Sequence, residues 1–310
     1  MPVVNESGPI ARAFGNILLG EPVRHGALTV IPLLAPMLAE PQWLTLAEAD
    51  DHVQITEVDE AGSVPTLKVA NRADRPLLLL DGEELVGAKQ NRILNTTVLV
   101  AARTETTIPV SCVEQGRWGY RGRNFTSGDA SLFASIRRKK AAWVTRSIRA
   151  GRGHTSNQGG VWDELASKAT AHKIDSPTGA MRDFYARYED DMAVARRALA
   201  PAPGQIGAIV YVSGRWAGAD LVAGAGLFGR AWSRLGVGYA ADAIGRKPSA
   251  RLTPSPGTVL QRLAACPVEV APAVGLGTEY RLTGLKTAGA ALVADDCVVH
   301  LMAFPASRVD

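Results

Sequence analysis

The sequence predicts an α+β fold in which an antiparallel β-rich amino-terminal half packs with a helical and mixed α/β carboxy-terminal half. Between about residues 28 and 113, short runs rich in Val, Ile, Leu and Thr alternate with Pro, Gly, Asp and Asn, which is typical of strands. From about residue 129 the apolar spacing becomes three and four residues, which is typical of helices. Because 310 residues exceed one comfortable core, we expect two subdomains, a β-rich one at 1–120 and a helical and mixed one at 121–310.

The elements follow in chain order from these patterns. A short helix is expected at 45–51, and the strands are expected over the runs ALTVIPLL, HVQITEV, VPTLKVANR, PLLLLDG, ILNTTVLVA and TTIPVSCV. Helices are expected over SLFASIRRKKAAWVTRSIR, over VWDELASKATAHK and, as one long helix with Thr178 as N-cap, over TGAMRDFYARYEDDMAVARRAL. A hairpin turning at Ser213 and Gly214, a helix to about 244, a linker at 245–257 and strands near 280–286, 290–294 and 297–304 complete the chain.

Composition and cysteine usage indicate a folded cytoplasmic protein without membrane contact. Apolar residues make up 46% and charged residues 21%, values that suit a buried core. The longest apolar stretch, LTVIPLLAPMLA, is interrupted by prolines and is shorter than the ~20 residues of a membrane helix, and no signal-peptide pattern precedes it. Cys112, Cys266 and Cys297 are widely spaced and lack a CxxC pair, which argues against a disulfide framework or a dedicated zinc site.

Residues 121–152 form a basic segment within a chain whose net charge is +4. One acid, Asp129, stands among nine basic side chains: Arg121, Arg123, Arg137, Arg138, Lys139, Lys140, Arg146, Arg149 and Arg152. The segment fits a solvated helix face, and it also fits a docking surface for a partner or for phosphates. No interleaved aromatic residues accompany the charges, so nucleic acid is not the expected partner, although the segment leaves it open.

The run GAGLFG, Gly224 to Gly229, matches the G-x-G-x-x-G pattern of dinucleotide-binding folds. The strand before it is predicted to be the second arm of a hairpin, and no acid-terminated strand follows about 20 residues later, since Asp242 falls on the predicted helix. We therefore expect these glycines to begin a closely packed helix.

The densest polar stretch is GEELVGAKQNRILN, residues 82–95, which follows the apolar run LLLL at 77–80 and Asp81. Two strand arrangements fit it. If Asp81 and Gly82 form a tight turn, 83–86 is a strand, whereas if 82–92 is one wide loop, 77–80 pairs with 93–100. Both place 89–92 beside 111–118 at one end of a sheet, and only the second brings Glu83 and Glu84 into the same cluster.

This juxtaposition predicts a polar cluster with the chemistry of a nucleotide site. Cationic groups could clamp a diphosphate, amides could bind ribose or base edges, and an indole could stack on a base. The expected ligand-binding residues are Lys89, Gln90, Asn91, Arg92, Gln115, Arg117 and Trp118. Glu114, joined by Glu83 and Glu84 in the wide-loop arrangement, could act as general base or hold a divalent metal such as Mg²⁺ or Mn²⁺.

For two residues the sequence pattern favours a structural role over a chemical one. Cys112 alternates with Ile108 and Val110 on one strand face and has no histidine close in sequence, so we interpret it as a buried thiol and only secondarily as a nucleophile. His300 alternates with apolar neighbours in CVVHLMAF and is interpreted as a satisfied core histidine.

GEELVGAKQNRILN together with IPVSCVEQGRW resembles the signature of the family named for its association with ADP-ribosylglycohydrolases and rhodanese-phosphatase proteins, a domain of unknown function. HGALTVIPLL and VSGRWAGADL with the helix ending YAADAIG resemble its other blocks, so the likeness covers most of the chain. The resemblance implies metabolism of ADP-ribose or other NAD-derived nucleotides. This chain departs from the family at one helix start: where the family usually has polar residues, this chain has GAGLFG.

The sequence hypothesis is therefore a hydrolase acting on an ADP-ribose-like or other NAD-derived nucleotide. Two alternatives remain open: a non-catalytic nucleotide-binding module, and an interaction or assembly protein that docks through the helix at 131–149. A homo-oligomer is also left open. A purely structural explanation is that Glu114 and Arg92 or Arg117 satisfy one another as a buried ion pair.

Overall fold

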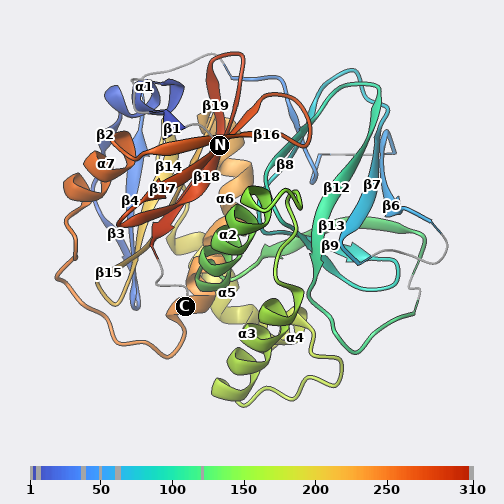
Figure 1. The fold of residues 1–310 in the computed structure, drawn as a ribbon. Helices are drawn as coiled ribbons and strands as arrows, with labels where there is room; N and C mark the ends of the chain where they lie inside the picture. Colours follow the sequence, from blue (N-terminus) through green and yellow to red (C-terminus); the bar gives the residue numbers. More distant parts are fainter. Residues whose placement is uncertain are drawn as a thin grey trace.

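The computed structural model describes residues 3–4, 8–35, 40–48, 51–59, 64–119 and 122–306, and it confirms the α+β class. Two β units lie side by side in Figure 1, with helix α2 running between them. One is a ten-stranded sheet, and the other is a closed six-stranded barrel with a small three-stranded sheet against it.

The ten-stranded sheet combines strands from both ends of the chain, all paired antiparallel. In order across the sheet the strands are β1 (Val3–Val4), β16 (Val268–Pro272), β17 (Thr278–Gly284), β18 (Thr287–Ala294), β19 (Cys297–Pro305), β15 (Arg215–Val222), β14 (Gln205–Val212), β4 (Leu28–Leu34) and β2 (Leu18–Leu19), with β3 (Val23–His25) also paired to β4. The predicted turn between β14 and β15 is confirmed, because Ser213 and Gly214 have φ values of 50° and 73°, as a tight hairpin turn requires.

The barrel is built from the middle of the sequence. Around the barrel the strands are β10 (Arg92–Leu94), β12 (Thr104–Cys112), β7 (Thr66–Asn71), β6 (Val53–Glu57), β13 (Asn124–Ser131) and β9 (Glu83–Gly87). The three-stranded sheet consists of β11 (Val98–Val100), β8 (Leu77–Leu79) and β5 (Leu44–Thr45), and its leucines and valines join the apolar core of the barrel.

Helices cover both faces of the ten-stranded sheet. The described helices are α1 (Pro9–Gly15), α2 (Ala134–Arg149), α3 (Gln158–Ala171), α4 (Met181–Arg187), α5 (Glu189–Ala198), α6 (Ala225–Ala243) and α7 (Pro256–Ala264). Side chains of α1 and α7 share one core with Ile209 and Leu301, while those of α2 and α6 share another with Val210 and Val222. Within the part of the chain that the structure describes, no helix is both long and apolar enough to cross a membrane.

Three local predictions were wrong. Residues 45–48 are the end of a strand and a turn, because the Glu48 carboxylate accepts hydrogen bonds from Thr45 N (2.9 Å) and Oγ1 (2.7 Å), and 49–50 lie outside the described residues. The long helix is broken at Tyr188, where three acids begin the first turn of α5 and favour a new helix amino terminus. Its observed N-cap is Ala180, not Thr178.

The expected elements also did not include β16 or helix α7, which begins inside the expected linker. Ser255 caps α7 by accepting a hydrogen bond from Thr258 N, and Pro256 occupies the first helical position. The two β units do not divide at residue 120, where the subdomain boundary was expected, because each unit contains strands from both sides of it. Strands β2, β3 and β4 join the ten-stranded sheet, and β13 completes the barrel.

Candidate functional site

The strand register brings the two polar blocks of the sequence together at one end of the barrel. On adjacent strands Arg92 lies opposite Cys112 and also opposite Leu85, so these three side chains point to the same side of the barrel wall. Leu85 belongs to the apolar core inside the barrel, which places Arg92 and Cys112 in the interior as well. We call the polar end formed by Glu57, Lys89, Arg92, Cys112, Glu114 and Trp118 the barrel mouth.

Arg92 is a buried cation whose hydrogen bonds are incomplete. Its side chain is 0% exposed, and Nη1 donates to Gln90 Oε1 (2.9 Å). Nη2 lies 3.8 Å from Glu57 Oε1, too far for a hydrogen bond. Within the described residues, Arg92 Nε and Nη2 and both carboxylate oxygens of Glu57 have no hydrogen-bond partner. Burial lowers the pKa of Arg92, but guanidinium groups stay protonated in proteins.

Glu114 is held by its neighbours in the same loop. Its Oε2 accepts from Arg117 Nη2 (2.6 Å) and from the backbone N of Asn91 (3.2 Å). Arg117 also donates to Asn91 Oδ1 (3.1 Å) and to the carbonyl oxygen of Ala88 (2.8 Å). Gln90 Nε2 donates to the carbonyl oxygen of Glu114 (3.0 Å). These contacts bind residues 88–91 to residues 114–117.

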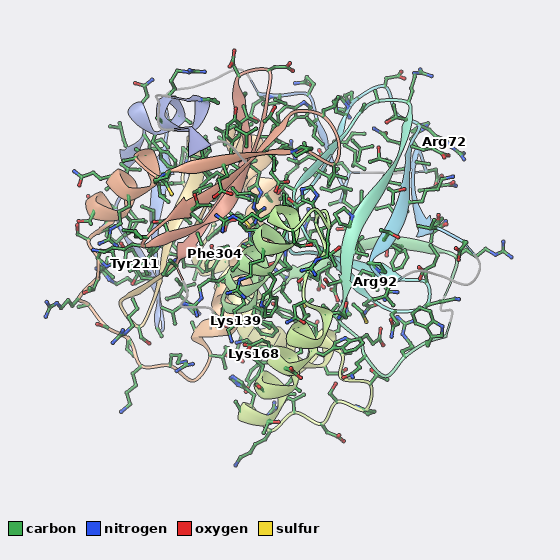
Figure 2. All side chains as sticks on the ribbon, viewed as in Figure 1. Arg72, Arg92, Lys139, Lys168, Tyr211 and Phe304 are labelled. Carbon is green, nitrogen blue, oxygen red and sulfur yellow. The ribbon has the colours of Figure 1, made fainter. Side chains whose placement is uncertain are left out.

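Lys89 and Trp118 form the outer part of the barrel mouth. Trp118 is 52% exposed, and its ring centroid lies 5.1 Å from Lys89 Nζ and 5.9 Å from Arg92 Cζ, within cation–π range. Figure 2 labels Arg92 near the lower part of the barrel, whereas Arg72 lies at the opposite end of the strands.

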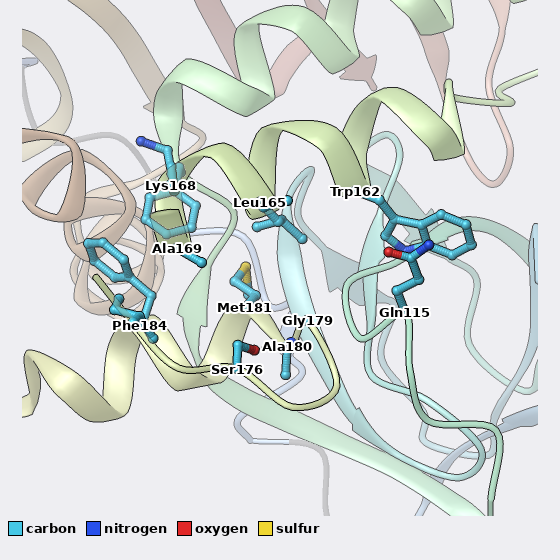
Figure 3. A pocket seen from close by; sticks show the side chains of 13 residues that line it. Gln115, Trp162, Leu165, Lys168, Ala169, Ser176, Gly179, Ala180, Met181 and Phe184 are labelled. Carbon is cyan, nitrogen blue, oxygen red and sulfur yellow. Dashed lines mark hydrogen bonds between the residues drawn. The ribbon is translucent and has the colours of Figure 1, made fainter. Parts of the chain in front are cut away.

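Gln115 faces away from the barrel mouth. It contributes to a cavity of about 40 Å³ together with Trp162 of α3 and Ala180 and Met181 at the start of α4 (Figure 3). A volume of this size accommodates a water molecule but not a nucleotide, so Gln115 has no nucleotide-sized cavity at this position.

Glu83 and Glu84 do not join the cluster around Glu114. Residues 83–87 form strand β9, as the tight-turn arrangement predicted, while 77–79 pairs with 98–100, as the wide-loop arrangement predicted. Glu83 forms an ion pair with Arg234 (2.8 Å), and Glu84 accepts from Arg182 Nη1 (3.0 Å) on the other face of the strand. Burial raises the pKa of Glu84 to about 7, with Arg182 opposing the shift.

Cys112 has the contacts of a structural thiol. Its side chain is fully buried, burial raises the pKa of the thiol, and its sulfur accepts a hydrogen bond from Glu114 N (3.3 Å). Gln158 of α3 bonds both the backbone N (2.7 Å) and the carbonyl oxygen (2.9 Å) of Cys112. A thiol held in this way is a poor nucleophile.

A second set of polar and ionisable residues, of which only His300 was anticipated as buried from the sequence, lies between the barrel and the ten-stranded sheet. It comprises Asp81, Thr97, Arg137, Lys140, Asp220, Tyr239 and His300, and we call it the interior network. Arg137 of α2 binds both oxygens of Asp220 (2.8 and 3.2 Å) and one of Asp81 (3.2 Å). Lys140 donates to Asp81 and to two backbone carbonyl oxygens.

The other side of Asp220 is equally well occupied. Tyr239 OH donates to it (2.7 Å), and His300 bridges it to Thr97 (3.1 and 2.6 Å), which confirms His300 as a satisfied core histidine. Burial would raise the pKa of Asp220, but Arg137 and His300 hold it below its usual value. Burial lowers the pKa of Lys140 to about 8 even though Asp81 opposes the shift.

The basic segment therefore divides between interior and surface. Arg121 lies outside the described residues, Arg137 and Lys140 are buried in the interior network, and Lys139 and Arg149 form ion pairs with Glu164 and Glu269. Helix α2 has an apolar stripe at Ala141, Val144 and Ile148, and Arg137 and Lys140 fall on the same stripe. Their position on that stripe is the sequence signal that could have revealed their burial.

The glycine run begins helix α6, as predicted. Gly224 is the N-cap residue in extended backbone, and the Glu40 carboxylate accepts a hydrogen bond from Gly226 N (2.8 Å). The helix amino terminus thus has an anionic partner from the chain itself. Among the described residues, no group of three or more His, Cys, Asp or Glu side chains gathers at distances that would hold a metal ion.

Comparison with known proteins identifies a family for this chain. A family model described as the ARG and Rhodanese-Phosphatase-superfamily-associated Protein domain matches residues 16–304, nearly the whole chain. No curated protein and no solved structure matches. The chain therefore belongs to the ARG and Rhodanese-Phosphatase-superfamily-associated Protein domain family.

Proposed function

We propose that this protein binds an ADP-ribose-like nucleotide at the barrel mouth and hydrolyses it there. The observation that carries the proposal is Arg92, a fully buried cation with two nitrogens that lack hydrogen-bond partners among the described residues. Leaving such donors unpaired costs free energy, which an anionic ligand would recover by accepting from them.

The surroundings of Arg92 suit a ligand with a diphosphate and a flat base. Lys89 supplies a second positive charge, and the half-exposed Trp118 ring offers a stacking surface. A ligand that stacks on this ring, or takes its place, would come within reach of Arg92. Small barrels bind ligands at their mouths because their interiors are filled by side chains, as this one is.

The hydrolytic step is assigned to Glu114. In the free protein its carboxylate accepts from Arg117 and from Asn91 N. A diphosphate that recruits the Arg117 guanidinium would release one Glu114 oxygen, which could then take a proton from water attacking a phosphoester or an N-glycosidic carbon. The name of the family, which refers to ADP-ribosylglycohydrolases, agrees with this chemistry.

A binding module without turnover is the second candidate, because Glu114 Oε2 already accepts hydrogen bonds from Arg117 and from Asn91 N. For either candidate we propose a cytoplasmic location. Cys112, Cys266 and Cys297 are all free thiols, which suits a reducing compartment.

The test is thermal stabilisation by ADP-ribose, its phosphorylated forms, NAD and AMP, each with and without Mg²⁺ or Mn²⁺. We expect one of these nucleotides to raise the melting temperature of the unmodified protein but not that of Arg92→Met. The control is Arg72→Met, which replaces an exposed arginine at the other end of the barrel and should keep the rise. A shift retained in Arg92→Met would contradict the assignment of the ligand to the barrel mouth.

Turnover separates the two candidates. If the protein is a hydrolase, chromatography will detect product from the stabilising nucleotide, and Glu114→Gln will bind but not hydrolyse it. Binding without product in the unmodified protein would overturn the hydrolytic assignment and support the binding module.

A further inference from the structure

Two adjoining hollows lie where α5 meets α6, on elements separate from those that form the barrel mouth. The first has a volume of about 120 Å³ and is lined by Leu199, Pro201, Gly229, Trp232 and Gly236, among others. An apolar cavity of about 150 Å³ binds benzene, so this hollow has approximately the size of one six-membered ring.

The second hollow is larger and more polar, with a volume of about 370 Å³. Its lining includes Ser127 and Asp129 of β13 together with Arg196 of α5 and Arg234 of α6. Arg196 and Ser233 line both hollows, so the apolar and the polar hollow adjoin, and together we call them the depression.

Arg196, which lines the polar hollow, has no carboxylate partner among the described residues. Arg196 donates through Nε to the carbonyl oxygen of Ser233 (3.1 Å) and through Nη2 to that of Asp129, and it forms no ion pair with any described residue. The Asp129 carboxylate is paired with Arg182 instead (3.0 Å). Carbonyl oxygens satisfy hydrogen-bond donors but do not cancel the charge of a guanidinium.

Arg234 provides a second, independent indication of a ligand. Its side chain is only 9% exposed, its Nη2 is paired with Glu83, and its buried Nε has no hydrogen-bond partner in the described part of the chain. Native proteins rarely leave such a donor unpaired, and Arg234 lines the hollow directly.

We propose that this depression is a second ligand site, which binds a phosphate monoester carrying a flat ring. The phosphate lies against the guanidinium groups of Arg196 and Arg234, the two arginines that line the polar hollow. The ring enters the apolar hollow beside Trp232 and Leu199.

Phenyl phosphate and inorganic phosphate are the probes, titrated by NMR with the Trp232 indole N–H as reporter. We expect phenyl phosphate to shift this signal and to bind about tenfold more tightly than inorganic phosphate, because its ring fills the apolar hollow. No shift of the Trp232 signal with either probe would overturn the proposal.

Two variants test the two halves of the site separately. Arg196→Ala, on a partly exposed side chain, should weaken both probes about tenfold, while its exposed neighbour Arg197→Ala serves as the matched control. Gly229→Leu should remove the preference for phenyl phosphate, since nothing lies within 4 Å of a Cβ at Gly229 and the new side chain would fill the hollow. Gly257→Leu, at an equally open helical glycine of α7, is its control.

The barrel mouth variant Arg92→Met distinguishes this proposal from the proposed function. Phenyl phosphate should bind Arg92→Met as it binds the unmodified protein, whatever that variant does to nucleotide binding. Loss of phenyl phosphate binding in Arg92→Met with retention in Arg196→Ala would place the probe at the barrel mouth and overturn the second site.

Discussion

The interior network and the barrel mouth both bury arginine and carboxylate side chains, but they satisfy them to different degrees. In the interior network Arg137 binds two aspartates at 2.8–3.2 Å, and Asp220 accepts from three different side chains. At the barrel mouth Arg92 lies 3.8 Å from Glu57, and neither Glu57 oxygen has a hydrogen-bond partner among the described residues.

The difference indicates that buried charged side chains can have two roles within one chain, stabilising the fold and binding a ligand. An ion pair with complete hydrogen bonding holds its elements together, and removing one partner strongly lowers the free energy of unfolding. An incompletely bonded pair contributes little to folding and remains available to a ligand. The interior network joins α2, which runs between the two β units in Figure 1, to both of them, whereas the strand residues of the barrel mouth all belong to the barrel.

The largest effect is expected from breaking the interior network. Arg137→Met would leave Asp81 and Asp220 buried beside one fewer cation, so we expect a loss of about 3–5 kcal/mol in the free energy of unfolding. Denaturation by urea measures it. Lys139→Met, next to it but partly exposed and paired with Glu164, should change stability by less than about 1 kcal/mol. Equal effects of the two variants would contradict the role assigned to the interior network.

A pH-dependent effect of intermediate size is expected at Glu84. Its folded-state pKa of about 7 lies above the usual 4.5, so the folded protein holds a proton that the unfolded chain releases, and stability falls as pH rises between these values. The fall attributable to Glu84 is at most about 3 kcal/mol. Glu84→Gln should abolish this fall, whereas Glu105→Gln, at an exposed carboxylate, should keep it. The free energy of unfolding is measured from pH 5 to 8 for the unmodified protein and both variants. The same pH dependence in all three proteins would refute the raised pKa of Glu84.

A smaller effect is expected from replacing the charged pair of the barrel mouth. Because Arg92 and Glu57 are poorly bonded, Arg92→Met combined with Glu57→Gln should remain within about 1 kcal/mol of the unmodified protein or exceed its stability. Urea denaturation again provides the measurement. A loss as large as that of Arg137→Met would show that the two regions do not differ in the way described.

A similarly small effect is expected at Cys112. Cys112→Ala removes one buried sulfur and should cost about 1 kcal/mol without changing turnover. In the folded protein a thiol reagent should modify Cys266 and Cys297, which are partly exposed, well before Cys112. Rapid modification of Cys112 that abolishes turnover would restore it as a nucleophile.

The sequence predicted the fold class and the proximity of 89–92 to 111–118, because strand alternation and turn residues are local signals. It could not separate Glu83 and Glu84 from Glu114. Their positions depend on β9 pairing with β10 and β13 while β8 pairs with β11, a non-local choice. For the same reason Arg137 and Lys140 were grouped with a surface segment, since their aspartate partners lie 56 to 83 residues away in the chain.

The central claim is that the barrel mouth binds a nucleotide, and the indole N–H signal of Trp118 tests it most directly. The signal is assigned with Trp118→Phe and followed by NMR during titration with ADP-ribose, in the unmodified protein and in Arg92→Met combined with Glu57→Gln. We predict that the Trp118 signal shifts in the unmodified protein and stays in place in the double variant. A Trp118 signal that does not move in the unmodified protein, while Trp232 does, would contradict the claim and place the nucleotide between α5 and α6.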